Sequence, residues 1–152
     1  MKIVEKNSTF NIFYSGKNRQ TGLTVTFDIW DDSGNIHGAN IPGPEISTNG
    51  VYKAEFKVPN QNLYLLIIGT DGTQKSPMVV QVGTPAIKKV FHTHRFFETG
   101  KTIPYGVYGA NEAILQSGNL TEELQGFYSA DVNSLTLPYY FKVTPLTKIV
   151  KQ

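Results

Sequence analysis

Residues 23–29 read Leu-Thr-Val-Thr-Phe-Asp-Ile and carry an apolar side chain at every second position. Successive side chains of a β-strand point to opposite faces, so this alternation predicts a strand with one buried and one solvent-facing side. Residues 10–14 and 52–58 follow the same pattern, with charged side chains on the outer face of the second segment. Residues 63–68, Leu-Tyr-Leu-Leu-Ile-Ile, are apolar throughout, which predicts a strand buried on both faces.

Turn-forming residues separate these segments. Residues 32–35 (Asp-Ser-Gly-Asn), 49–50 (Asn-Gly) and 71–72 (Asp-Gly) each supply a Gly or Asn that adopts positive φ at low cost. Short strands with a turn at intervals of about 8–12 residues are typical of β-sandwiches and barrels. We therefore expect an all-β chain in which residues 1–83 form one small antiparallel β-sandwich.

The pattern changes near residues 83–85, Gly-Thr-Pro, which we interpret as a domain boundary. Residues 84–100 are rich in basic and aromatic side chains, and we expect them to form a linker or arm. Alternation returns from Lys101 onward. Residues 101–152 are therefore expected to form a smaller β-rich C-terminal unit, either an extension of the sandwich or a second sandwich-like unit.

One segment of the first part has a counterpart in the last. Residues 50–56 read Gly-Val-Tyr-Lys-Ala-Glu-Phe, and residues 126–132 read Gly-Phe-Tyr-Ser-Ala-Asp-Val. The similarity indicates either an internal repeat or two sandwich strands that converged on one pattern. A second unit of this size buries little surface by itself, so we expect it to pack on the first domain or on a neighbouring subunit.

Composition excludes several classes of protein. The 152 residues include no cysteine, which excludes disulfides, thiolate metal sites and a cysteine nucleophile. The net charge of +2 is too small for a dedicated nucleic-acid binder, so we expect no nucleic-acid partner. The N-terminus has no signal-peptide pattern, and the longest apolar run, residues 63–68, is far shorter than the about 20 residues that span a bilayer. We expect a soluble protein with no membrane partner.

No motif indicates an enzyme. The sequence contains no Gly-x-Ser-x-Gly, no phosphate-binding glycine loop and no His-Glu-x-x-His. Glu122 and Glu123 are adjacent, and neighbouring residues of a strand point to opposite faces, so the two carboxylates do not flank one bond. We expect no catalytic residue and no cofactor.

Two segments resemble metal sites only in part. Counted from Asp31, an EF-hand loop would need glutamate at the position that Pro42 occupies, so we interpret residues 31–35 as a turn. His92 and His94 share a face if they lie on a strand, but a zinc site would need a third ligand, such as Glu98. We expect no bound metal.

The basic and aromatic segment is the candidate partner interface. It has three interpretations: its cations meet phosphate or an acidic surface, its phenylalanines belong to a core, or an arm crosses to another chain and buries them there. We favour the third, because exposed aromatic clusters usually mark partner contacts. The candidate residues are Lys88, Lys89, Phe91, His92, His94, Arg95, Phe96 and Phe97.

Carbohydrate binding is the alternative function. β-Sandwich modules often stack sugars on exposed aromatic rings. Trp30, the one tryptophan of the chain, lies on the polar side of its predicted strand. Tyr105 and Tyr108 are further candidates, so the chain is alternatively a carbohydrate- or cell-surface-binding adhesion module.

Residues 10–82 resemble a known group of modules. The elements are the strand at 21–30, Thr-Gly-Leu-Thr-Val-Thr-Phe-Asp-Ile-Trp, then Gly50 with Tyr52, and Tyr64 with Leu66. This order is similar to immunoglobulin-like and carboxypeptidase-regulatory-like β-sandwich modules of tailed-bacteriophage virion proteins and of bacterial surface proteins.

The resemblance implies an immunoglobulin-like sandwich that serves as a scaffold and has no catalytic residues. It implies a structural virion protein, either a capsid decoration or a neck or tail accessory component, which is synthesised in the host bacterial cytoplasm. The implied partners are other virion structural proteins and copies of the chain itself.

Overall fold

The computed structural model describes residues 1–94, 97–133, 135 and 139–143. The described residues are rich in strands and contain no helix of seven or more residues, which confirms the all-β prediction. The chain forms two compact units, of which one spans Met1–Ala86 and the other begins at Ile87. None of the described helices is long and apolar enough to cross a membrane.

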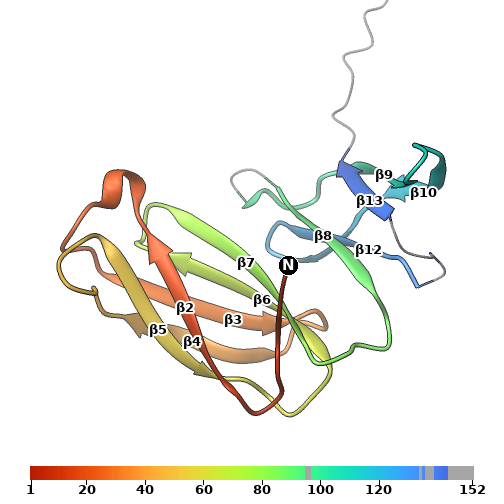
Figure 1. Ribbon diagram of the computed structural model, residues 1–152. Coiled ribbons are helices and arrows are strands. Elements are labelled where there is room, and N and C mark those ends of the chain that lie inside the picture. The colour runs from red at the N-terminus through yellow and green to blue at the C-terminus, as the bar shows by residue number, and fades with distance from the viewer. Residues whose placement is uncertain (95–96, 134, 136–138, 144–152) are drawn as a thin grey trace, which may run out of the picture. The chain divides into compact units, whose positions relative to one another are not determined.

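The first unit consists of two sheets (Figure 1). Five strands are ordered β1-β7-β6-β3-β4, and β2 pairs with β5 in the second sheet. Neighbouring strands are antiparallel except β1, which is parallel to β7. The strands are β1 (Lys2–Val4), β2 (Thr9–Ser15), β3 (Val25–Asp31), β4 (Ile36–Gly43), β5 (Val51–Lys57), β6 (Leu63–Thr70) and β7 (Lys75–Val82), with a short 3-10 turn at Lys17–Arg19.

Alternating apolar residues from both sheets form the core of the first unit. Phe27 and Ile29 of β3 meet Ile12 of β2 in this core, and each is at most 1% exposed. Burial of these side chains stabilises the unit at roughly 25 cal/mol per Å² of apolar surface removed from water. The strand β6 is buried along Leu63–Gly69 on both faces, as its uninterrupted apolar sequence predicts.

Asp31 organises the turn between β3 and β4. Its carboxylate accepts hydrogen bonds from the backbone N–H groups of Ser33 and Asn35, each at 2.9 Å, and lies 3.0 Å from Nε2 of His37. Burial alone would raise the pKa of Asp31, but the hydrogen bonds from Asn35, His37 and Ser33 outweigh it and lower the pKa. The interpretation of residues 31–35 as a turn is confirmed.

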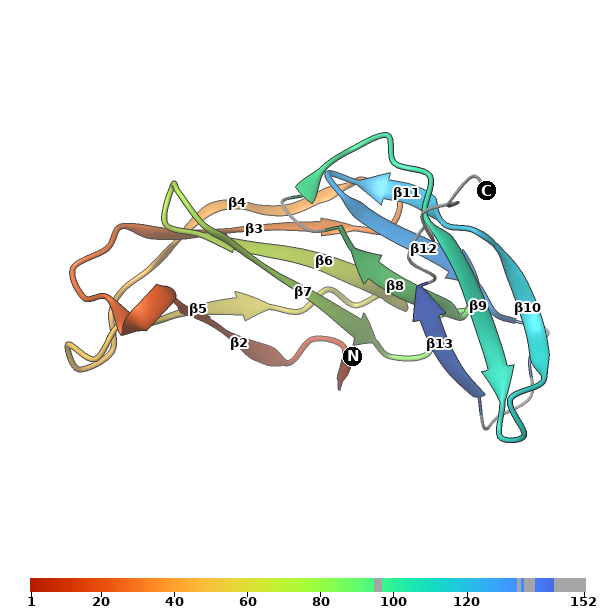
Figure 2. The same cartoon turned by 90° about the horizontal axis from the view of Figure 1, so that it is seen from above.

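The second unit consists of two three-stranded sheets, ordered β10-β9-β13 and β11-β12-β8. Figure 2 shows β9 between β10 and β13. A smaller core lies around Tyr105, Val107 and Tyr128. The strands are β8 (Lys89–Thr93), β9 (Pro104–Gly109), β10 (Ile114–Asn119), β11 (Thr121–Leu124), β12 (Phe127–Asp131) and β13 (Tyr139–Val143).

The segment 84–100 differs from the linker or arm that the sequence suggested. Its residues Lys89–Thr93 form β8, which pairs with β12 along its whole length. The strand is therefore part of the second unit. Mixed charged and aromatic side chains obscured its alternation, and its partner strand lies far along the chain.

The second unit repeats the strand pairing of the first. β8 pairs with β12 as β2 pairs with β5, and β9 lies between β10 and β13 as β3 lies between β4 and β6. The registers also correspond: Tyr108 faces Tyr140 where Trp30 faces Leu66. These pairings favour an internal repeat over a chance similarity of two strands.

The loops of the two units share one hydrogen-bonding arrangement. In each unit one glutamate, Glu45 or Glu122, accepts two backbone N–H groups of glycines at 2.7–3.1 Å. These glycines are Gly22 and Gly50 in the first unit and Gly100 and Gly126 in the second. Converging strand patterns do not account for matched loop contacts, so the repeat extends to the loops.

A tyrosine completes the same loop in each unit. The Tyr52 hydroxyl accepts the N–H of Leu23 at 2.8 Å and donates to the carbonyl of Gln20 at 3.1 Å. The Tyr128 hydroxyl makes the matching pair of bonds. Its partners are the N–H of Lys101 at 3.0 Å and the carbonyl of Glu98 at 2.9 Å.

Candidate functional site

A groove lies at corresponding positions in the two units. In the first unit it runs between the end of β4 and residues 53–55 of β5, with a volume of about 680 Å³. In the second unit it runs between β10 and residues 129–131 of β12, with a volume of about 310 Å³. The registers of the two units make residues 53–55 and 129–131 equivalent. The groove is thus a recurrent feature of the fold.

The side chains that line the two grooves differ in chemistry. The groove of the first unit is lined by apolar residues, among them Pro42, Pro44 and Ile46, together with the charged residues Glu45, Lys53 and Glu55. Polar side chains from β8 to β12 line the groove of the second unit, and six of them are Lys89, Gln116, Asn119, Thr121, Glu123 and Asp131. We call this polar groove of the second unit the candidate site.

A shielded ion pair forms one side of the candidate site. Nζ of Lys89 lies 2.9 Å from Oε1 of Glu123, and the two side chains are 12% and 14% exposed. The hydroxyl of Ser129 donates to the same carboxylate oxygen. The register of β11 shifts between Glu122 and Leu124, at the position of Glu123. Such irregularities re-aim side chains.

A second hydrogen-bonded group forms the side next to β10. Nε2 of Gln116 donates to the Tyr105 hydroxyl at 2.6 Å and to the backbone carbonyl of Asp131 at 2.8 Å. The ring of Tyr105 belongs to the core of the second unit and is 7% exposed as a residue. The core therefore fixes the ring, while the hydroxyl stands at the groove.

Sequence reasoning missed Glu123 as a site residue. Glu122 binds the loop glycines and Glu123 binds Lys89, so the two adjacent carboxylates have different partners. No spacing of residues along the chain would have found the site. In the repeat, Leu124 lies opposite the first residue of β12 as Ile46 lies opposite the first residue of β5, so Glu123 is an extra residue that has no counterpart in the first unit.

The candidate interface residues divide between the two faces of β8. His92 lies on the face of Val90, which packs against the core, whereas Lys89 and Phe91 lie on the opposite face. Burial lowers the pKa of His92, and the nearby His94 lowers it further. Phe97 packs edge-on against Phe127 at a ring distance of 6.1 Å.

Other interface candidates are not gathered into one exposed patch. The backbone N–H of Lys88 donates to the side chain of Asn133. Nδ1 of His94 lies 3.7 Å from a carboxylate oxygen of Glu98. Arg95 and Phe96 lie outside the described residues. In the described part of the chain, no three His, Asp or Glu side chains gather as a metal-binding group.

The three aromatic residues suggested for sugar stacking belong to two different units. Trp30 is half-buried in β3 of the first unit. Tyr105 and Tyr108 point to opposite faces of β9, because they lie three positions apart and successive side chains of a strand alternate between its faces. Tyr108 stacks instead on Tyr140, with ring centroids 5.3 Å apart and Nζ of Lys142 beside both rings. Of the three, Tyr105 alone reaches the candidate site.

No protein-family model matches the chain, and no curated protein matches it.

Proposed function

We propose that the chain is a non-enzymatic structural protein of a tailed-bacteriophage particle that acts by protein–protein association. Its position would be a capsid decoration or a neck or tail accessory component. The resemblance of residues 10–82 supports the particle, and one open strand edge supports the association. The partners are other virion structural proteins and further copies of the chain.

The strand order supports an immunoglobulin-like sandwich for the first unit. In immunoglobulin folds the second and fifth strands, B and E, are neighbours in one sheet, and strands C, F and G are neighbours in the other. Here β2 pairs with β5, and β3, β6 and β7 are consecutive in the larger sheet. β4 then corresponds to the additional strand beside C in variable-type domains.

The single observation that carries association concerns the edge of β13 that faces away from β9, which has no partner strand among the residues that the structure describes. In the first unit, β6 pairs with β3 on one side and with β7 on the other. Its counterpart β13 pairs with β9, and no residue that the structure describes pairs with the opposite edge. An unpaired edge presents a row of backbone donors and acceptors to another strand.

The side chains of β13 show what an added strand would cover. Leu65 and Ile67 of β6 are 0% and 1% exposed. Their counterparts Tyr139 and Phe141 are only partly buried, although they pack against the core of the second unit. In the first unit, β7 contributes fully buried Val80 to the corresponding side of the core. A partner strand on β13 would complete the second unit in the same way.

Two substitutions on the same sheet test the open edge. Val143→Lys places a charge at the end of β13, where it opposes strand addition. Because Val143 also packs against the core of the second unit, the melting temperature of this variant is measured to establish that it is folded. Ile114→Lys is the matched control on β10, the other edge of that sheet, where Ile114 is already 65% exposed. We expect sedimentation velocity to show that the chain associates with itself or with proteins of the neighbouring genes, and that only Val143→Lys abolishes this.

Hydrogen exchange decides which strand is added. Within residues 139–143, the backbone amides that point away from β9 should be protected in the assembly and exchange rapidly in the dissociated chain, whereas those bonded to β9 are protected in both. Protection of the outward-pointing amides in a monomer would mean that the edge is satisfied within the chain, and it would refute association through β13. Equal loss of assembly in both lysine variants would also refute it. Capsid, portal or tail genes beside the coding sequence would support the virion setting, and metabolic genes would count against it.

A further inference from the structure

The internal repeat provides a built-in comparison for the candidate site. Both units hold a groove at the same place. In the first unit, Asn11 stands at the position of Lys89, and the extra residue Glu123 has no counterpart. The fold is therefore compatible with a groove that lacks the Lys89–Glu123 ion pair, and the presence of this pair in the second unit needs another explanation.

The polar lining also carries an energetic cost. Lys89 and Glu123 are 12% and 14% exposed, so both charges are largely withdrawn from water. Removing two charges from water costs free energy that their attraction often does not fully return. The first unit avoids that cost, because it has no ion pair at the corresponding positions. A ligand that uses the polar groups would account for their presence.

We propose that the candidate site binds a neutral carbohydrate. Sugar hydroxyls donate and accept at once, so they match sites that mix carboxylate, amide and hydroxyl groups. The site offers the carboxylate of Asp131, the amides of Gln116 and Asn119, and the hydroxyl of Thr121. Its volume of about 310 Å³ lies at the small end of ligand pockets, which suits one or two sugar rings.

The charges of the site select against anions. Lys89 is paired with Glu123, and Asp131 adds a further negative charge, so the lining carries more negative than positive charge. A phosphate or sulfate group would meet repulsion from this lining. Tyr105 is held in the core, so its hydroxyl, rather than its ring face, is available at the groove. Recognition therefore depends on hydrogen bonds.

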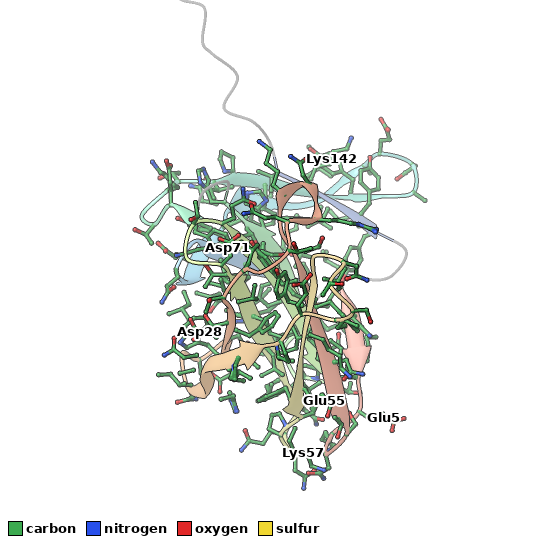
Figure 3. All side chains as sticks on the ribbon, turned by 90° about the vertical axis from the view of Figure 1, so that its left-hand side faces the viewer. Glu5, Asp28, Glu55, Lys57, Asp71 and Lys142 are labelled. Atoms are coloured by element: carbon green, nitrogen blue, oxygen red, sulfur yellow. The ribbon has the colours of Figure 1, made fainter. Side chains whose placement is uncertain are left out.

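The rim of the site permits substitutions that spare the fold. Asn119 and Asp131 are exposed, and their side chains make no hydrogen bond with any residue that the structure describes. Glu55 is the equivalent of Asp131 in the first unit, where it lines the other groove and lies exposed along β5 (Figure 3). Asp131→Ala and Glu55→Ala thus form a matched pair, and Asn119→Ala is a second test at the candidate site.

The experiment is a glycan array of neutral and acidic oligosaccharides probed with the full-length chain, followed by titration calorimetry with the strongest glycan. We expect a neutral glycan to bind. Asp131→Ala and Asn119→Ala should each weaken it about tenfold, the effect of losing one or two hydrogen bonds. Glu55→Ala should bind as the unaltered chain does, and all three variants should keep the melting temperature within a few degrees.

Several outcomes would overturn the proposal. These are no binding on the array, binding of acidic glycans alone, and binding that both candidate-site variants retain. Loss of binding in Glu55→Ala would move the site to the first unit. Val143→Lys changes β13, which contributes no lining residue to the groove. A folded Val143→Lys variant should therefore still bind the glycan, which separates this proposal from the one on assembly.

Discussion

Replacing Tyr128 by phenylalanine removes one hydroxyl from the loop contact that the two units share. The aromatic ring stays in the core of the second unit, where Tyr128 is 1% exposed. Two hydrogen bonds are lost, one from the N–H of Lys101 at 3.0 Å and one to the carbonyl of Glu98 at 2.9 Å. The substitution therefore tests whether the repeated loop contact stabilises the unit.

The expected loss follows from those two bonds. Each intramolecular hydrogen bond contributes about 0.5–1.5 kcal/mol net, so Tyr128→Phe should cost about 1–3 kcal/mol. A loss near 2 kcal/mol speeds exchange from the globally opened unit about 30-fold, since each 1.4 kcal/mol corresponds to a factor of ten. Tyr52→Phe removes the matching bonds to Leu23 and Gln20 and should cost the first unit a similar amount.

Hydrogen exchange with peptide-level mass spectrometry resolves the two units in one measurement. In Tyr128→Phe, we expect faster exchange in the peptides of β9 and β12. In Tyr52→Phe, we expect it in those of β3 and β5. Unchanged exchange in the second unit of Tyr128→Phe, beside a clear effect of Tyr52→Phe in the first, would refute the reasoning. The shared geometry would then not be a shared source of stability.

Two further predictions concern backbone geometry and pH. Gly126 has φ +81°, and a Cβ there would lie 2.6 Å from the carbonyl carbon of Phe97, whereas Gly72 has φ +87° and open space around it. Gly126→Ala should therefore lower the urea midpoint by more than Gly72→Ala, which carries only the conformational cost of about 1 kcal/mol. The pKa of Asp31 is lowered in the folded state, so below about pH 4 the unfolded chain takes up a proton more readily, and the free energy of unfolding falls. Urea titrations in acid should show this fall in the free energy of unfolding. The Asp31→Asn variant should be less stable at neutral pH, and its free energy of unfolding should fall less steeply in acid. An equally steep fall in Asp31→Asn would assign the pH dependence to other carboxylates.

The strands of the first unit could be predicted because consecutive residues of each strand show which side chains are buried. Residues 23–29 alternate and form most of β3, with Val25, Phe27 and Ile29 buried. The uninterrupted run at 63–68 falls within β6, which is buried on both faces. In each case the pattern of apolar residues within one strand reflects how many faces of that strand are buried.

The second unit was harder to predict because its determinants are not local. β8 carries Lys89 and His92 among apolar residues, and its identity as a strand depends on pairing with β12. Glu123 is a site residue only because the register of β11 shifts there and because Lys89 arrives from β8. The spacing of residues along the chain shows neither the register shift of β11 nor the pairing of Glu123 with Lys89. The candidate site therefore could not be found from a sequence motif.

The repeat separates what the fold requires from what each unit adds. Both units keep the glutamate, the glycines and the tyrosine of the shared loop, because these satisfy backbone groups that any chain of this shape must satisfy. They differ at the edge and at the groove. β6 is paired on both sides whereas β13 has one described partner, and the Lys89–Glu123 pair has no counterpart in the first unit. Differences on a common frame are where distinct roles arise, so the second unit is the one in which we place both association and ligand binding.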